Sequence, residues 1–135
     1  MIVVDANVIV YLFIQGDHTT EAKSVLKADP EWTAPYLWRS EFRNVLALYV
    51  RKKLLSLTDA LAMALEAEAL MDGSEYEVAP AAVLNLAAGS NCSAYDCEYV
   101  ALALNLNVPL VTTDRQLLQE FSSTAVSMES FTRES

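Results

Sequence analysis

Residues 1–5 read Met-Ile-Val-Val-Asp, an apolar run that stops abruptly at an acid. Its β-branched residues favour a strand buried on both faces, as in a parallel sheet. A second such run, Val-Pro-Leu-Val-Thr at 108–112, is followed by Thr113 and Asp114. Helical patterns separate the two runs, and alternation of strands with helices predicts a parallel sheet covered on both faces. We therefore expect an α/β fold in which Asp5 and Asp114 follow the carboxyl ends of two strands.

The other expected elements follow from hydrophobic periodicity, cap residues and helix breakers. Shorter strand patterns lie at 31–34, 75–78 and 125–128. Helices are expected at 7–14, at 19–27 with Thr19 or Thr20 as cap, at 35–53, at 58–71 with Thr58-Asp59 as cap signal, at 80–89, at 94–106 after the cap Ser93, and at 115–121. No repeat or linker divides residues 1–135, so we expect a single domain.

The charge of the chain limits its partners. A formal net charge of −9 disfavours non-specific binding to nucleic acids, because phosphate contacts need Lys and Arg. Five of the nine basic residues nevertheless fall within residues 39–53, namely Arg39, Arg43, Arg51, Lys52 and Lys53. This segment is the candidate contact for a polyanion, and a solvated helix face accounts for it equally well. No apolar run is long enough for a bilayer and no basic leader is present, so we expect a cytoplasmic protein without a membrane contact.

Few residues are available for catalysis by side chains other than acids. His18 is the only histidine and lies in a polar stretch, which argues against a zinc site of Cys and His ligands and against a Ser-His-Asp or Cys-His arrangement. Cys92 and Cys97 are expected to be ordinary small apolar residues.

Glu41 stands out among the acids. It lies on or beside the apolar stripe of its helix, three residues after Trp38, and no Lys or Arg is three or four residues away to pair with it. A carboxylate in this position is costly without a partner, which points to a metal or a distant cation. The alternative is an acid at the edge of the stripe that reaches water.

The other three acids have both functional and structural interpretations. Asp5 and Asp114 could be helix caps or turn residues, and the helix dipole alone accounts for Asp96 in the first turn after Ser93. Tyr99, Val100 and Ala103 follow Asp96 at helical spacing, which suggests that Asp96 faces inward. Four acids at one point would repel one another, and a divalent cation would relieve this. Oxygen ligands favour Mg²⁺ or Mn²⁺, which can activate a water and stabilise charge on a phosphodiester.

Four stretches together resemble the PIN domain, and most of all its VapC-type toxin branch. They are Val-Val-Asp-Ala-Asn-Val (3–8), Ser-Glu-Phe-Arg-Asn-Val-Leu (40–46), Ser-Ala-Tyr-Asp-Cys-Glu-Tyr-Val-Ala-Leu-Ala (93–103) and Pro-Leu-Val-Thr-Thr-Asp-Arg-Gln-Leu (109–117). The resemblance covers nearly the whole chain in the right order. It implies a Rossmann-like, three-layer α/β/α fold with a mostly parallel central sheet. It also implies a Mg²⁺- or Mn²⁺-dependent endoribonuclease that acts as the toxin of a toxin–antitoxin pair.

The resemblance also implies a set of site residues. Asp5, Glu41, Asp96 and Asp114 are the expected metal ligands, Asn7 matches the small polar position after the first acid, and Thr112 would orient a ligand or water through its hydroxyl. The implied partners are RNA, a cognate antitoxin and a second copy of the chain, with Arg39 and Arg43 as the expected RNA contacts. Many members carry another acid shortly after the last Asp, whereas residues 115–118 here are Arg-Gln-Leu-Leu, so a second metal is left open.

Two other functions are compatible with parts of the sequence. One is a catalytically silent PIN-like scaffold that binds a protein or RNA, against which the presence of all four acids argues. The other is a phospho-acceptor domain or an aspartate-based phosphatase, which also places an Asp after the first strand. Those families use a lysine late in the chain, and this chain has none after Lys53, so the last interpretation is disfavoured.

Overall fold

A central parallel sheet organises the computed structural model, which describes residues 1–134. The strands are β1 (Ile2–Val4), β2 (Trp32–Pro35), β3 (Glu75–Tyr76), β4 (Leu110–Val111) and β5 (Ala125–Val126). They lie in the order β3-β2-β1-β4-β5, and each of the pairs is parallel. The predicted strands are therefore confirmed, although each is only two to four residues long.

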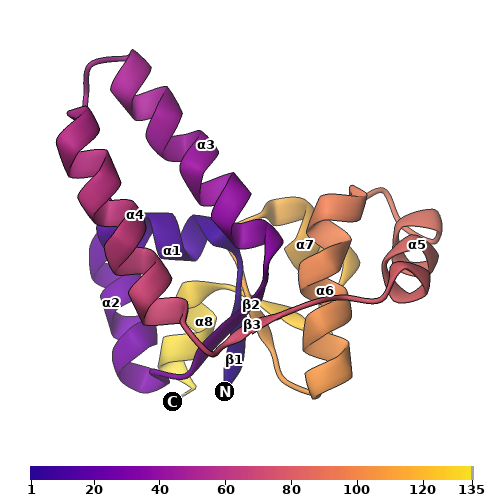
Figure 1. The fold of residues 1–135 in the computed structure, drawn as a ribbon. Coiled ribbons are helices and arrows are strands. Elements are labelled where there is room, and N and C mark those ends of the chain that lie inside the picture. The colour runs from indigo at the N-terminus through magenta and orange to yellow at the C-terminus, as the bar shows by residue number, and fades with distance from the viewer. Residues whose placement is uncertain (135) are drawn as a thin grey trace.

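Helices cover both faces of the sheet, which confirms the three-layer α/β/α fold (Figure 1). One layer contains α1 (Ala6–Phe13), α2 (Thr19–Ala28), α3 (Leu37–Arg51), α4 (Leu57–Met71) and α8 (Met128–Arg133). The other contains α5 (Pro80–Ala88), α6 (Ala94–Leu106) and α7 (Arg115–Glu120). Helices α3 and α4 form a hairpin whose tip projects beyond the sheet. None of the helices within residues 1–134 has the length and apolar character needed to cross a membrane.

Strand β1 is the centre of the core and positions the first acid. Ile2, Val3 and Val4 are buried because β1 lies between β2 and β4 and is covered by helices on both faces. The backbone N–H of Asp5 donates to the carbonyl oxygen of Val111, so the end of β1 is held beside the end of β4. This pairing brings the residues that follow the two strands to the same edge of the sheet.

Several local predictions were wrong in detail. The helix expected from residue 35 begins at Leu37, because Trp32–Pro35 is a strand that pairs with both β1 and β3. Thr19 does not cap α2 from outside but lies inside the helix, where its hydroxyl bonds the backbone of Gly16 and Ile14. The N-terminus of α4 is capped by Ser56, not by Thr58-Asp59.

Two other helices begin after serine caps. Ser93 caps α6 as predicted, since its hydroxyl accepts from the N–H of Asp96. The segment expected to be a strand over 125–128 contains only β5, and α8 begins at Met128 after the cap Ser127.

Candidate active site

The four predicted acids line one cavity at the carboxyl edge of the sheet. Its volume is about 190 Å³, and its walls are formed by Asp5, Ala6, Asn7, Glu41, Asn44, Val45, Asp96 and Asp114. The acids follow β1 and β4 or lie on α3 and the first turn of α6. The structure thus brings together acids that are up to 109 positions apart in the chain, and Asn7 with them.

Asp5 is the most deeply buried of these acids, with 6% of its surface exposed. Burial raises the pKa of Asp5 to about 6, and the neighbouring carboxylates of Glu41, Asp96 and Asp114 act in the same direction. Asp5 stands at the N-cap position of α1, but its side chain makes no cap hydrogen bond. Helix capping therefore does not account for this buried acid.

Thr112 supports Asp5 from inside the protein. Its side chain is buried, and its hydroxyl donates to Oδ2 of Asp5 at 2.7 Å. The same hydroxyl oxygen accepts from the backbone N–H of Asp114 at 3.0 Å. Thr112 thus ties Asp5 to the start of α7. The hydrogen bond opposes burial by favouring the charged form of Asp5.

Glu41 has a partner that the sequence did not indicate. The hydroxyl of Tyr99 donates to Oε1 of Glu41 at 2.6 Å, across 58 positions of the chain. Burial raises the pKa of Glu41. The hydrogen bond from Tyr99 lowers it, and the charges of Asp96 and Glu98 raise it further. The only signal in the sequence was that Tyr99 shares the inward face of α6 with Asp96.

Asp96 and Asp114 combine a structural role with their place in the cavity. Asp96 occupies the first turn of α6, which Ser93 caps. Burial is the main cause that raises the pKa of the Asp96 carboxyl, and the charge of Asp114 adds to it. Oδ1 of Asp114 caps α7 by accepting from the N–H groups of Gln116 and Leu117. The cap considered for Asp114 is therefore present. It uses one carboxylate oxygen and leaves Oδ2 without a hydrogen-bond partner among residues 1–134.

The chemistry of this cavity fits a divalent cation, but no ion cage is preformed. Its polar side chains present only carboxylates and amides, which are ligands of hard cations. Among residues 1–134, no three Asp, Glu, Cys or His side chains are grouped closely enough to hold an ion as they stand. The acids share a cavity, and the charges of neighbouring acids raise the pKa values of Asp5, Glu41 and Asp96, so a cation would relieve this repulsion while drawing side chains inward.

Arg39 and Arg43 differ in their surroundings. The guanidinium of Arg39 donates to Glu75 at 2.6 and 2.7 Å and to Glu68 at 3.0 Å, so it links α3 to β3 and α4. Arg43 is exposed, and its only ion pair within residues 1–134 is a 3.6 Å contact with Glu68. The RNA contact predicted for both residues stays a prediction, and at Arg39 it would compete with two carboxylates already in place.

The cysteines and the histidine lie outside the cavity. Cys92 and Cys97 are buried and free. Burial and the carboxylate of Glu120 raise the pKa of Cys92 to about 12, which leaves the thiol protonated and unreactive. His18 is exposed, packs against the ring of Tyr11 and pairs with Glu21.

Comparison with known proteins identifies the family. The family profile of the PIN domain matches residues 2–122, which is most of the chain. The chain belongs to the PIN domain family. Its acids Asp5, Glu41, Asp96 and Asp114 all fall inside the matched region. The comparison with curated protein sequences gives no significant match.

Two solved structures resemble the whole of this PIN domain. The crystal structure of PAE2754 from Pyrobaculum aerophilum is 22% identical, with a TM-score of 0.77 over 98% of this chain and 93% of that chain. A toxin–antitoxin complex from Klebsiella pneumoniae contains a chain that is 16% identical, with a TM-score of 0.67 over 95% of this chain and 98% of that chain. At these identities the likeness establishes a shared fold.

Proposed function

We propose that this PIN domain is a divalent-metal-dependent endoribonuclease and the toxin of a toxin–antitoxin pair. The observation that carries the proposal is the cavity that Asp5, Glu41, Asp96 and Asp114 line together, in which the other three acids raise the pKa of Asp5. PIN domains are generally nucleases, and the family assignment supports a nuclease of this kind. An all-oxygen donor set favours Mg²⁺ or Mn²⁺ over zinc.

The residues of the chain have distinct parts in this activity. The four carboxylates would hold the cation, with Thr112 keeping Asp5 oriented toward the cavity. A bound divalent cation lowers the pKa of water and neutralises charge on a phosphodiester. Asn7 and Asn44 line the same cavity and offer amide N–H groups to a phosphate or ribose oxygen. Because Asp5 must lose its proton to bind a cation, metal affinity should rise with pH through about 6.

A cleavage assay on single-stranded RNA tests this proposal. The purified protein should cut RNA when Mg²⁺ or Mn²⁺ is added, and excess chelator should stop it. Asp96→Asn should abolish cleavage and leave the fold intact, whereas Asp17→Asn, the same charge change on an exposed residue, should leave the rate unchanged. Failure of the metal-loaded protein to cut any RNA would contradict the proposal and favour the silent scaffold.

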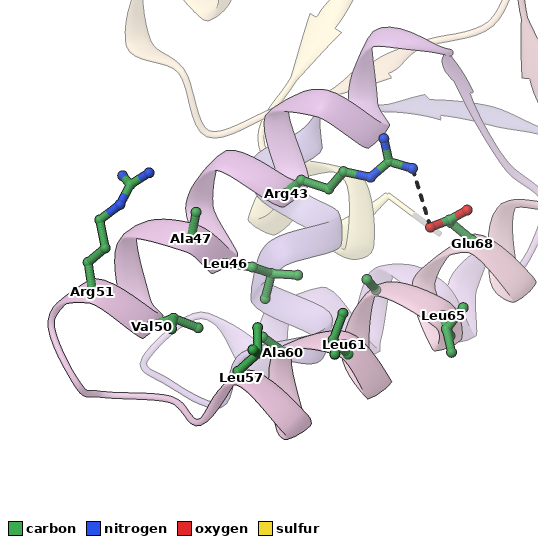
Figure 2. A pocket seen from close by; sticks show the side chains of 11 residues that line it. Arg43, Leu46, Ala47, Val50, Arg51, Leu57, Ala60, Leu61, Leu65 and Glu68 are labelled. Carbon is green, nitrogen blue, oxygen red and sulfur yellow. Dashed lines mark ion pairs between the residues drawn. The ribbon is translucent and has the colours of Figure 1, made fainter.

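An apolar groove between α3 and α4 supports the toxin–antitoxin assignment. The groove is about 650 Å³ and is lined by Leu46 and Val50 of α3 and by Leu57, Leu61 and Leu65 of α4 (Figure 2). The three α4 leucines recur every four residues and are 63%, 58% and 71% exposed. Such a row of exposed leucines on one helix face is typical of a surface that a partner covers.

We assign this groove to an amphipathic helix of the antitoxin with acidic flanks. A helix presents apolar residues every three or four positions, which matches the leucine row of α4. Arg43 and Arg51 stand on the α3 rim of the groove (Figure 2), and Lys52 and Lys53 follow at the hairpin tip. In a chain of net charge −9, this basic rim complements acidic side chains on a partner.

The partner for this test is the protein encoded by the reading frame next to that of this chain, as the candidate antitoxin. Co-expression should yield a stable complex with this chain, and Leu61→Asp should disrupt that complex, while Leu84→Asp, a matched change of an exposed leucine on α5, should not. Light scattering should find the predicted homodimer in both variants. If Leu61→Asp instead converts the dimer to a monomer and leaves the complex intact, the groove belongs to the second copy.

A further inference from the structure

Tyr99 connects two of the helices that contribute acids to the cavity, α6 and α3, from inside the protein. It is buried on α6, three residues after Asp96. Its hydroxyl donates to Oε1 of Glu41 at 2.6 Å. This hydroxyl therefore links α6 to α3.

The bond to Glu41 constrains a side chain that would otherwise be free to turn. The carboxylate of Glu41 is only partly buried, and no Lys or Arg within residues 1–134 forms an ion pair with it. A 2.6 Å hydrogen bond from a hydroxyl to a carboxylate is short and charge-assisted. It occupies Oε1 and leaves Oε2 with no hydrogen-bond partner in the described part of the chain.

We propose that Tyr99 is a positioning residue of the metal centre, holding Glu41 so that its free oxygen faces an incoming Mg²⁺ or Mn²⁺. This inference rests on the proposed function, since it requires that the cavity bind a divalent cation. Partners that orient metal ligands typically contribute ten- to hundredfold to metal affinity. Tyr99 thus acts through Glu41 and need not touch RNA.

Direct measurement of Mn²⁺ binding tests this role without relying on catalysis. The signal of free Mn²⁺ in electron paramagnetic resonance gives the dissociation constant for wild type and for Tyr99→Phe, which removes only the hydroxyl. We expect binding to weaken about tenfold or more in Tyr99→Phe. Tyr95→Phe is the matched control, because Tyr95 is on the same helix but is exposed. Equal affinity of wild type and Tyr99→Phe would overturn the proposal.

A double-mutant cycle separates positioning from simple packing. If Tyr99 acts through Glu41, Tyr99→Phe should weaken Mn²⁺ binding in the wild-type background and have little effect in Glu41→Gln. A packing role would weaken binding equally in both backgrounds, and that result would contradict the proposal.

Two further results keep the test decisive. If wild type itself binds no Mn²⁺, the proposed function fails. If wild type binds Mn²⁺ and Tyr99→Phe binds it equally well, only the role of Tyr99 is contradicted. If Tyr99→Phe does not fold, ring-carbon chemical shifts of the wild-type protein replace it. Saturation with Mg²⁺ should then shift the Cζ resonance of Tyr99 but not that of Tyr95, and an unmoved Tyr99 would overturn the proposal.

Discussion

Replacing Asp5 by Asn should stabilise the metal-free protein while removing its response to metal. Asp5 is buried beside three other acids, so its charged form is unfavourable in the folded state. Asn has the same shape, and its amide oxygen can still accept the hydrogen bond from Thr112. The substitution therefore removes a buried charge and keeps the packing around it.

The expected size follows from the difference in pKa between folded and unfolded chains. The pKa of Asp5 is about 6 in the folded state, against the ordinary value of 3.8 for an aspartate in water. The folded state binds the proton more tightly, so the free energy of unfolding falls as pH rises from about 4 to about 6 and is then constant. At 1.36 kcal/mol per pKa unit, the penalty above pH 6 is about 3 kcal/mol, or about 10 °C in melting temperature.

Denaturant unfolding in chelator, across pH 4 to 8, measures this penalty. The free energy of unfolding of Asp5→Asn should exceed that of wild type by up to about 3 kcal/mol at pH 8, and this difference should disappear toward pH 4. Asp17→Asn should follow the wild type throughout, because Asp17 is exposed. With Mn²⁺ at a hundred times its dissociation constant, wild type should gain about 2.7 kcal/mol, and Asp5→Asn should gain far less. A variant that is no more stable than wild type at pH 8, or a gap independent of pH, would refute this reasoning.

Three further outcomes are expected. Thr112→Val should slow RNA cleavage, but less severely than Asp96→Asn, which should abolish it. The same substitution should lower the free energy of unfolding by about 1–3 kcal/mol in a thermal melt, because a buried hydroxyl that bonds two groups is lost. Arg39→Ala should lower the free energy of unfolding, measured with denaturant, by about 2 kcal/mol, because the carboxylate of Glu75, whose side chain is only 4% exposed, loses its cation. The bond from Arg39 lowers the pKa of Glu75, so this loss should become smaller as the pH falls below about 4.5. Arg43→Ala should change the free energy of unfolding by less than about 0.5 kcal/mol but reduce the salt dependence of RNA binding. An unchanged salt dependence would mean that Arg43 is a solvated surface residue that does not contact RNA.

The strand ends and the acids could be predicted because the signals were local. Asp5 and Asp114 each follow a short apolar strand, and parallel strands bring such residues to one edge. Helix periodicity was sufficient to mark Glu41 as an acid on an apolar stripe. The sequence also contained a signal for α8 that was missed, since Ser127 before Met128 and Glu129 is a cap pattern.

The partners of these residues could not be predicted in the same way. Tyr99 meets Glu41 across 58 positions, and Glu75 meets Arg39 across 36. Which acid a given Arg or Tyr pairs with depends on how α3 and α6 cross the sheet, and neither propensity nor spacing contains that information. The basic segment at 39–53 therefore looked uniform in the sequence, whereas Arg39 is fully engaged and Arg43 is exposed.

The chemistry of the RNA ends after cleavage tests the central claim most directly. A cation held by Asp5, Glu41, Asp96 and Asp114 would supply an activated water as the nucleophile, and the lining of the cavity includes no histidine that could act as a base on the ribose 2′-hydroxyl. RNA cut by the Mn²⁺-loaded protein should therefore carry 5′-phosphate and 3′-hydroxyl ends, and cutting should cease in excess chelator and in Asp96→Asn. Products with 2′,3′-cyclic phosphates, or full activity in excess chelator, would contradict a metal-activated water as the nucleophile.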